Sequence, residues 1–286
     1  MSAIWTRGAR ALVLLPPLAW LVALFLVPFA FVLAISFAEG VDGAPPFRFA
    51  EFPWGTLASW RLLVEDDLYL VAFLNSLRIA ASATLITALI GYPMALAIVR
   101  APRAWRPLLL TLVILPFWTS FLIRVYAWMA LLRPTGVINN LLLGAGLIAE
   151  PLPLIANQFA VHLGLVYAYL PFMVLPLWAA LERIDPALGE AAADLGARPL
   201  ASFWRVTFPL SWPGLAAGAL LVFIPAAGEF VIPDLLGGPD TPMLGRVIWN
   251  EFFQNRDWPA AAAIAAAMVA LLAAPILAFQ RLERRA

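Results

Sequence analysis

Residues 182–209, ERIDPALGEAAADLGARPLASFWRVTFP, form a polar interruption between two long apolar segments, and they decide the fold. Asp185 can accept a hydrogen bond from a free backbone N–H as a helix N-cap. Pro186 suits the first helical position, because the N–H that proline lacks would have no partner there. Gly196 offers a left-handed stop. The stretch therefore predicts a short helix over 186–195.

This predicted helix carries an apolar stripe on one face and two carboxylates on another. The stripe follows the i, i+3, i+4, i+7 spacing of a helix face and consists of Leu188, Ala191, Ala192 and Leu195. Glu190 and Asp194 are four residues apart, where like charges repel each other by a few tenths of a kcal/mol. The helix is either a solvated loop helix or a knob that fits the groove of a partner protein, and the composition leaves both interpretations open.

The segments on both sides of the loop are too apolar for a protein dissolved in water. Of the 286 residues, 64% are hydrophobic and 12% are charged, whereas soluble domains have roughly 25% charged residues. About 20 apolar residues can cross a hydrocarbon core roughly 30 Å thick. Six segments are this long: 11–37, 71–99, 108–132, 158–181, 210–236 and 259–280. The expected fold is an all-α integral membrane protein with six transmembrane helices, and a second short element over 200–206 should precede the fifth.

Arginine placement sets the expected orientation, because short loops rich in positive charge stay in the cytoplasm. All 18 basic residues are arginines, and 11 of them lie before helix 1, between helices 2 and 3, between helices 4 and 5, or after helix 6. These are Arg7, Arg10, Arg100, Arg103, Arg106, Arg183, Arg198, Arg205, Arg281, Arg284 and Arg285. Both termini and the helix over 186–195 are therefore predicted to be cytoplasmic. The first apolar segment is expected to be a retained helix, since about 27 residues exceed the 7 to 15 of a signal sequence.

This orientation divides the chain into three parts. Residues 1–70 are expected to form a transmembrane helix with an extracytoplasmic loop, 71–281 a core of five transmembrane helices, and 282–286 a cytoplasmic tail. The 38–70 loop is acidic and aromatic. It either lies at the bilayer interface, where tryptophan is favoured, or forms a docking surface for an external partner.

The residues that the chain lacks exclude several functions. Without any lysine, it has no phosphate-binding loop of the G-x-x-x-x-G-K-[ST] type, so it has no such ATP site of its own. Without cysteine, and with His162 as the single histidine, it shows no recognisable metal-ligand cluster; His162 is expected to make an ordinary hydrogen bond. No nucleophile, base and orienting group recur at plausible spacing. We therefore expect no enzyme, no bound metal or cofactor, and no nucleic-acid partner.

The loop resembles the cytoplasmic signature of type I ATP-binding-cassette importer permeases: EAA, three residues, G, nine residues, I, one residue, LP. The matching positions are Glu190, Ala191, Ala192, Gly196, Val206, Phe208 and Pro209. Valine for isoleucine and phenylalanine for leucine are mild departures, and the spacing is kept throughout. The resemblance implies a coupling helix that docks on a separate ATPase. Its docking residues would be Glu190, Ala191, Ala192, Asp194, Leu195 and Gly196.

Further segments resemble the first permease subunit of polyamine importers. They are NSLRIA (75–80), GYPMALA (91–97), LPFWTSFLIRVYAWMALL (115–132), YLPFMVLPLW (169–178), GEFVIPDLLGGPD (228–240) and NRDWP (255–259). The last two look most like the putrescine type. The resemblance implies a multi-pass protein of the bacterial inner membrane that partners a second permease, two copies of an ATPase that uses ATP and Mg²⁺, a periplasmic binding protein and membrane lipid.

Charged residues inside apolar spans are candidates for the substrate pathway, because a charge at the bilayer centre costs at least about 2.5 to 3.5 kcal/mol. Glu229 lies roughly 10 Å from the outer end of the fifth helix. It follows Pro225 and Gly228, which can break a helix beside a cavity or packed protein. Arg124 has a similar depth in the third helix, so Glu229 either pairs with Arg124 or contacts a cationic substrate. Asp234 lies nearer the outer surface.

Three aromatic residues of the third helix are further candidates for the pathway. Trp118, Tyr126 and Trp128 could contact a cation with their ring faces. Tyr126 and Trp128 also match an outer aromatic belt, the commoner role for such residues. The sequence leaves both roles open.

The fifth helix contains the pair Gly214 and Gly218. Glycines spaced in this way let two helices approach closely. In a chain this apolar, the pair is weak evidence.

The leading interpretation is thus a pore subunit of an ATP-driven polyamine importer. One alternative is an ATP-driven permease for another small solute. A less favoured one is a secondary transporter in which Glu229 and Arg124 couple transport to an ion gradient.

Overall fold

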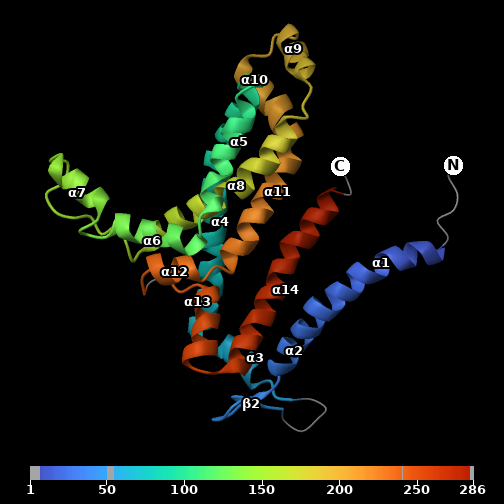
Figure 1. Cartoon of the computed structure of the whole chain (residues 1–286), viewed down its shortest axis with the longest axis vertical. Helices are drawn as coiled ribbons and strands as arrows, with labels where there is room; N and C mark the ends of the chain where they lie inside the picture. The colour runs from blue at the N-terminus through green and yellow to red at the C-terminus, as the bar shows by residue number, and fades with distance from the viewer. Residues whose placement is uncertain (1–6, 50–54, 240, 284–286) are drawn as a thin grey trace. The chain divides into compact units, whose positions relative to one another are not determined.

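The computed structural model describes residues 7–49, 55–239 and 241–283, and the chain is mostly helical (Figure 1). Residues 50–54 of the predicted extracytoplasmic loop lie outside the described residues, as do Arg284, Arg285 and Ala286 of the predicted tail. The chain forms two compact units. The first comprises residues 1–69 and 248–270, and the second comprises residues 70–247 and 271–286.

Within the described residues, six helical segments are long and apolar enough to span a membrane. They are Val13–Ile35, Asp67–Arg100, Phe121–Gly144, Gln158–Leu181, Pro199–Ala227 and Trp258–Leu277. A shorter apolar helix, Arg106–Trp118, follows the second. The sequence prediction of six spans is confirmed by length and composition, although two of the predicted segments are divided differently.

The first unit contains the N-terminal helix and a small extended ribbon. Its elements are α1 (Arg7–Leu21), the π-helical turn η1 (Val22–Leu26), α2 (Val27–Ile35), β1 (Glu39–Gly40), β2 (Phe47–Arg48), α3 (Ala58–Glu65), the π-helical turn η4 (Asn250–Gln254) and the part of α14 (Trp258–Glu283) up to Ala270. The two strands are antiparallel, with Glu39 opposite Arg48, and an ion pair of 3.3 Å joins these two side chains. The ring of Trp258 stacks on Phe252 at 4.8 Å between centroids, which fixes the start of α14 beside η4.

The second unit holds the remaining helices, with α4 from Leu70, α13 up to Val247 and α14 from Leu271. Its elements are α4 (Asp67–Arg100), α5 (Arg106–Ile114), η2 (Leu115–Trp118), α6 (Phe121–Leu132), α7 (Val137–Gly144), α8 (Gln158–Leu181), α9 (Pro186–Asp194), α10 (Pro199–Ser202), η3 (Phe203–Thr207), α11 (Phe208–Ala227), α12 (Val231–Leu236) and α13 (Leu244–Trp249). Figure 1 shows α8 and α11 side by side, with α9 and α10 beyond their ends.

Close approach at glycines holds the centre of the second unit together. Met173 of α8 is fully buried and fills the space left by two glycines. A Cβ on Gly91 of α4 would lie 2.9 Å from Met173 Cγ, and one on Gly218 of α11 would lie 2.9 Å from Met173 Sδ. A Cβ on Gly214 would clash with Ala180 of α8. The Gly214 and Gly218 pair therefore lies in the α8–α11 contact.

The third predicted span, 108–132, is not a single helix, so this expectation is wrong. The helix α5 ends at Ile114, and the 3₁₀ turn η2 follows. Thr119 is extended, with ψ 154°, before α6 begins at Phe121. Pro116 explains the interruption, because proline cannot donate the backbone hydrogen bond that continues a helix. The freed carbonyl of Pro116 accepts a hydrogen bond of 2.8 Å from Thr119 Oγ1.

The fifth predicted span, 210–236, is shifted at both ends. The expected separate element over 200–206 is instead the beginning of the span, because α10, η3 and α11 form one helical run, Pro199–Ala227. The N–H of Phe208 bonds five residues back to Phe203 O, and this wider turn is followed by Pro209 without a break. At the other end the helix stops at Ala227, next to Gly228. The predicted break near Pro225 and Gly228 is confirmed.

The glycine contacts generate a first prediction. Gly218→Leu should lower the free energy of unfolding by about 1–3 kcal/mol, because the added atoms must enter the space of Met173. The measurement is the thermal unfolding midpoint of the detergent-solubilised protein. Gly144→Ala is the matched control, since a Cβ on Gly144 would meet no atom within 4 Å. Equal midpoints for the two variants would show that the α8–α11 contact is not this close.

Candidate functional site

The loop helix α9 has the ends that the sequence predicts. The carboxylate of Asp185 accepts a hydrogen bond of 2.9 Å from the N–H of Ala187, and Pro186 is the first helical residue. Gly196 has φ +79°, the left-handed conformation expected of a helix stop. The helix ends at Asp194, one residue earlier than predicted. Its local structure thus follows from local sequence signals.

No residue of α9 is buried within the part of the chain that the structure describes. Leu195 is 89% exposed and Leu188 is also exposed, while Ala192 is half-buried. Glu190 and Asp194 are exposed, and neither carboxylate has an ion pair or a side-chain hydrogen bond within the described residues. The helix therefore presents apolar side chains beside two charges that are free to interact with another molecule.

The break after α11 holds a buried carboxylate. Glu229 is 9% exposed. Its Oε2 accepts a hydrogen bond of 2.5 Å from the hydroxyl of Tyr169 in α8, and its Oε1 accepts one of 3.0 Å from the N–H of Val231 at the start of α12. A Cβ on Gly245 of α13 would lie 2.6 Å from Glu229 O, so α13 lies directly against the break. Both donors are neutral, and no cationic side chain forms an ion pair with this carboxylate within the described residues.

The ion pair between Arg124 and Glu229, one of the two alternatives that the sequence left open, is not formed in this structure. Both residues are described, and no ion pair joins them in this part of the chain. The guanidinium of Arg124 instead lies over the ring of Phe117, at 4.8 Å from its centroid, and over that of Phe121 at 5.7 Å. Its buried Nε and Nη1 have no hydrogen-bond partner within the described residues. The break at η2 puts Arg124 in the first turn of α6, next to these rings, while Tyr169 supplies the donor to Glu229.

The other predicted pathway residues do not form one cluster. Asp234 forms an ion pair of 3.3 Å with Nε of Arg246. Trp118 is 74% exposed and Tyr126 is also exposed, whereas Trp128 packs edge-on against Tyr167 at 5.4 Å between centroids. The helices α6 and α12 do pack against each other. The helix that carries Tyr126 and Trp128 is therefore a neighbour of the helix that follows Glu229.

Tyr169 is the site residue that the sequence reasoning missed. A buried tyrosine in an apolar span needs a partner for its hydroxyl group, and Tyr169 lies in the YLPFMVLPLW segment. That requirement was a usable signal. The identity of the partner was not readable, because Glu229 is 60 residues away in the chain.

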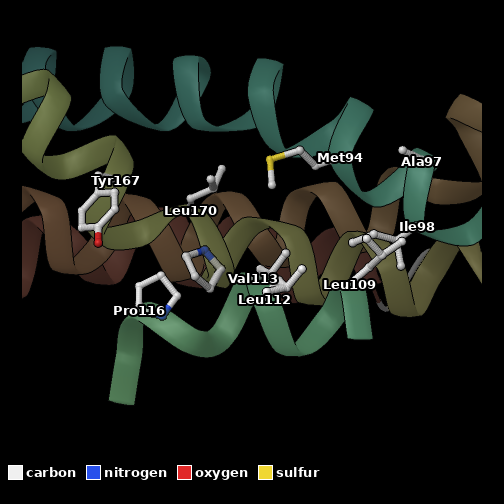
Figure 2. Close-up of a pocket in the computed structure, with 10 residues that line it drawn as sticks. Met94, Ala97, Ile98, Leu109, Leu112, Val113, Pro116, Tyr167 and Leu170 are labelled. Carbon is white, nitrogen blue, oxygen red and sulfur yellow. The ribbon is translucent and has the colours of Figure 1, made fainter. Parts of the chain in front are cut away.

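An apolar cavity of about 360 Å³ lies between α4, α5 with η2, and α8. Figure 2 shows Met94 of α4, Leu112 of α5 and Leu170 of α8 among its lining side chains, with the hydroxyl of Tyr167 at one end. No carboxylate lines it. A cation would lose its water there without replacement, which is costly, so this cavity is not a candidate site for a cation.

His162 makes the ordinary hydrogen bonds that were predicted. Its Nε2 lies 2.7 Å from Ser82 Oγ, and its Nδ1 lies 2.7 Å from Gln158 O. Within the described residues, no group of three His, Asp or Glu side chains is placed to hold a metal ion.

The fold is that of the membrane subunits of ATP-binding-cassette importers. The chain matches, with a TM-score of 0.75 and 20% identity, a bacterial transporter for the acidic polysaccharide alginate, covering 96% of this chain and 95% of that one. It also matches the methionine transporter MetNI in an inward-facing conformation, with a TM-score of 0.58 and 19% identity, covering 80% of this chain and 97% of that one. These similarities establish the fold.

Residues 87–286 match the family of binding-protein-dependent transport system inner membrane components, and the chain belongs to this family. It is 41% identical to the spermidine/putrescine transport system permease protein PotB of Haemophilus influenzae, over 93% of this chain and 91% of that protein. It is 40% identical to PotB of Escherichia coli, over 93% and 94%, and 33% identical to the inner membrane ABC transporter permease YdcU of E. coli, over 95% and 88%. The protein is therefore a multi-pass inner-membrane permease, and the family resemblance stated from the sequence is confirmed.

The bond between Tyr169 and Glu229 gives a second prediction. Tyr169→Phe should lower the free energy of unfolding by about 1–3 kcal/mol, because it leaves one buried carboxylate oxygen without a donor. Tyr167→Phe is the control on the same helix, since its hydroxyl makes no hydrogen bond within the described residues. Both midpoints would be measured by thermal unfolding in detergent. If both variants were as stable as the wild type, the hydroxyl of Tyr169 would not be holding the carboxylate.

Proposed function

We propose that the protein is one permease subunit of an ATP-driven importer for polyamines, and that it forms half of the translocation pathway. The similarity to two PotB permeases over more than nine-tenths of this chain carries this proposal. Those relatives are named for both spermidine and putrescine. The sequence resemblance of 228–240 and 255–259 favours putrescine as the substrate of this chain. Competition between labelled putrescine and spermidine for uptake by the reconstituted complex, with its own binding protein, distinguishes the two.

The pathway chemistry centres on Glu229. A polyamine that enters a low-dielectric path must exchange its water for carboxylates or aromatic faces. Glu229 lies in a non-helical break and has no cationic partner among the residues that the structure describes, so it can serve as a transient counter-ion for an ammonium group. Asp234 would attract the polyamine nearer the outer surface, and Trp118, Tyr126 and Trp128 would offer ring faces. Arg124 lies against two phenylalanine rings and would repel the substrate, so it would border the path.

The coupling proposal concerns α9, at the proposed cytoplasmic end of the membrane spans. The arginine bias puts α9 and both termini on the cytoplasmic side. There the exposed stripe with Leu188 and Leu195 would fit a groove of a separate ATPase, which would cover apolar surface that is otherwise in water. Glu190 and Asp194 would pair with basic groups of that ATPase. The small side chains of Ala191 and Ala192, and Gly196 just after the helix, would allow the ATPase to approach the backbone closely. The chain's lack of a phosphate-loop lysine agrees with ATP and Mg²⁺ being used by the partner.

The proposed complex contains a second permease, two ATPase copies, a periplasmic binding protein and surrounding lipid. The alginate transporter with the same fold was solved together with a substrate-bound periplasmic protein, which supports this arrangement. This chain itself is proposed to bind no cofactor and to catalyse no reaction. An importer of the same architecture for another small solute is the alternative, and the competition experiment tests it directly.

A secondary transporter would behave differently from an ATP-driven one. Uptake by proteoliposomes that contain this chain and the second permease should require the ATPase and internal ATP. Collapse of the proton gradient should leave uptake unchanged over the first minutes. Uptake that continues without the ATPase but stops with the gradient would replace the proposed mechanism with an ion-coupled one.

Reversing one charge on α9 gives a third prediction. Glu190→Lys should reduce polyamine uptake by about tenfold, corresponding to roughly 1.4 kcal/mol of lost docking free energy, and ATP hydrolysis should no longer respond to the loaded binding protein. The measurements are uptake and ATPase activity of the reconstituted complex. Glu150→Lys is the control, because Glu150 is also exposed but lies in the loop between α7 and α8. Normal coupling in Glu190→Lys would remove Glu190 from the docking surface.

Neutralising the buried carboxylate gives a fourth prediction. Glu229→Gln keeps an oxygen that can accept from Tyr169 or Val231 but removes the charge, so polyamine uptake should fall about tenfold, the effect of about 1.4 kcal/mol on a barrier. Adding Arg124→Gln should not restore uptake, because the two side chains do not pair in this structure. Uptake and the unfolding midpoint should be measured on the same samples. Restoration by the second substitution would show that the two charges do meet during transport.

A further inference from the structure

A second cavity, of about 420 Å³, lies where α4, α8 and α9 meet. Three arginines line it: Arg100 ends α4, Arg103 lies in the following turn, and Arg106 begins α5. Two carboxylates also line it, those of Glu182 and Asp185. The cavity thus lies between the segment that follows α4 and the segment that follows α8. None of the residues proposed for the transport pathway lines it.

The charges in this cavity are not evenly matched. Nη1 of Arg106 donates to both oxygens of Glu182 at 2.6 and 2.9 Å, and its Nε donates to Ala101 O at 3.0 Å. Asp185 is engaged as the N-cap of α9. The side chains of Arg100 and Arg103 have no hydrogen bond or ion pair within the described residues. Two guanidinium groups are therefore free, while both acidic side chains already hold a donor.

The position of the cavity matches the depth of lipid headgroups. Two of the spans end there, α4 at Arg100 and α8 at Leu181. Trp105 and Trp204, in neighbouring segments, are exposed, and tryptophan is enriched at this level of a bilayer. Leu96 and Val99 give the cavity apolar walls on the side of the spans. A cavity with an apolar wall and free arginines fits an amphiphile with an anionic head.

We infer that this cavity binds a phosphate ester, and that the ester is the headgroup of an anionic phospholipid. Arginine suits phosphate because its planar donors can bond two oxygens at once, and basic pockets between helices on the cytoplasmic side are known to take such headgroups. The polyamine substrate is a cation and is repelled by the same arginines. The inference rests on the proposed function for its orientation, in which this end of the spans faces the cytoplasm.

The site has a direct connection to the proposed coupling helix. Pro186 and Gly189 of α9 line the same cavity, on a face of the helix other than the one with Leu188 and Leu195. A phospholipid bound between Arg100 and Arg103 therefore lies against α9 without competing for its apolar stripe. It supports the base of the helix that docks the ATPase, so anionic lipid should strengthen coupling.

The test compares lipid retention by two double variants of the complex. Arg100→Gln/Arg103→Gln removes the free cavity charges, and Arg61→Gln/Arg133→Gln removes the same charge from exposed sites elsewhere. Complexes in nanodiscs of phosphatidylcholine with phosphatidylglycerol would be released and their bound phosphatidylglycerol counted by native mass spectrometry. The cavity variant should bind phosphatidylglycerol roughly thirtyfold more weakly than the wild type, and the control variant should bind it normally. Equal losses in both variants would overturn the inference, because they would reflect general charge attraction.

Two further arms of the experiment control for misfolding and identify the source of the phosphate group. Arg100→Lys/Arg103→Lys keeps both charges and should retain most of the lipid, which shows that loss in the glutamine variant is not misfolding. Inorganic phosphate is added to complexes in pure phosphatidylcholine. A thermal stabilisation by phosphate that requires Arg100 and Arg103, without retention of phosphatidylglycerol, would keep the phosphate site but overturn the lipid as its source. Lipid retention is measured without transport, so it can succeed even if the protein fails to import polyamines.

Discussion

Hydrocarbon offers no partner to a free backbone group, so a chain that crosses a membrane must satisfy its hydrogen bonds internally. The break after Ala227 is where this constraint acts most strongly in the structure. Glu229 accepts the N–H of Val231 through one oxygen and the hydroxyl of Tyr169 through the other. The carboxylate thereby replaces a helical acceptor and joins the start of α12 to α8. The same break is the position proposed to meet the ammonium group of a passing polyamine.

Close packing around Met173 holds together the helices that surround this break. Gly91 and Gly218 bring α4 and α11 against the same methionine of α8, so the three helices share one rigid contact. Gly245 allows α13 to lie against the backbone of Glu229. The helices therefore pack closely around a locally irregular segment, and discontinuous helices of this kind form the substrate sites of many transporters.

The end of the spans that carries α9 combines two faces with separate tasks. One face exposes Leu188 and Leu195 for the proposed ATPase partner. The other, with Pro186 and Gly189, borders a cavity lined by Arg100 and Arg103, whose side chains have no partner within the described residues. The bond of Arg106 to Glu182 joins the turn after α4 to the end of α8 and so holds this cavity together. The proposed protein partner and the proposed lipid would therefore contact different sides of the same short helix.

Local signals in the sequence were sufficient for much of this structure. Hydropathy predicted the number of spans, and Asp185, Pro186 and Gly196 predicted the ends of α9, because capping depends on residues within one helical turn. The coarse position of the break near Gly228 was also readable. Pro116 carried a signal for the break between α5 and α6, but the 25 residues from 108 to 132 are so largely apolar that they were predicted as one span.

The sequence by itself determined the class of protein. Its composition indicated a membrane environment, its apolar segments predicted six spans, its capping residues predicted the short loop helix, and it contains no phosphate-loop lysine. Only the tertiary structure decided which groups meet. Arg124 and Glu229 have opposite charges at similar depths, yet the break at η2 places Arg124 over phenylalanine rings, and the buried hydroxyl of Tyr169 takes the place expected for the arginine. The reason is geometric: a pairing between distant helices depends on how each helix is rotated and where it is interrupted, and neither quantity is fixed by the composition of a single span.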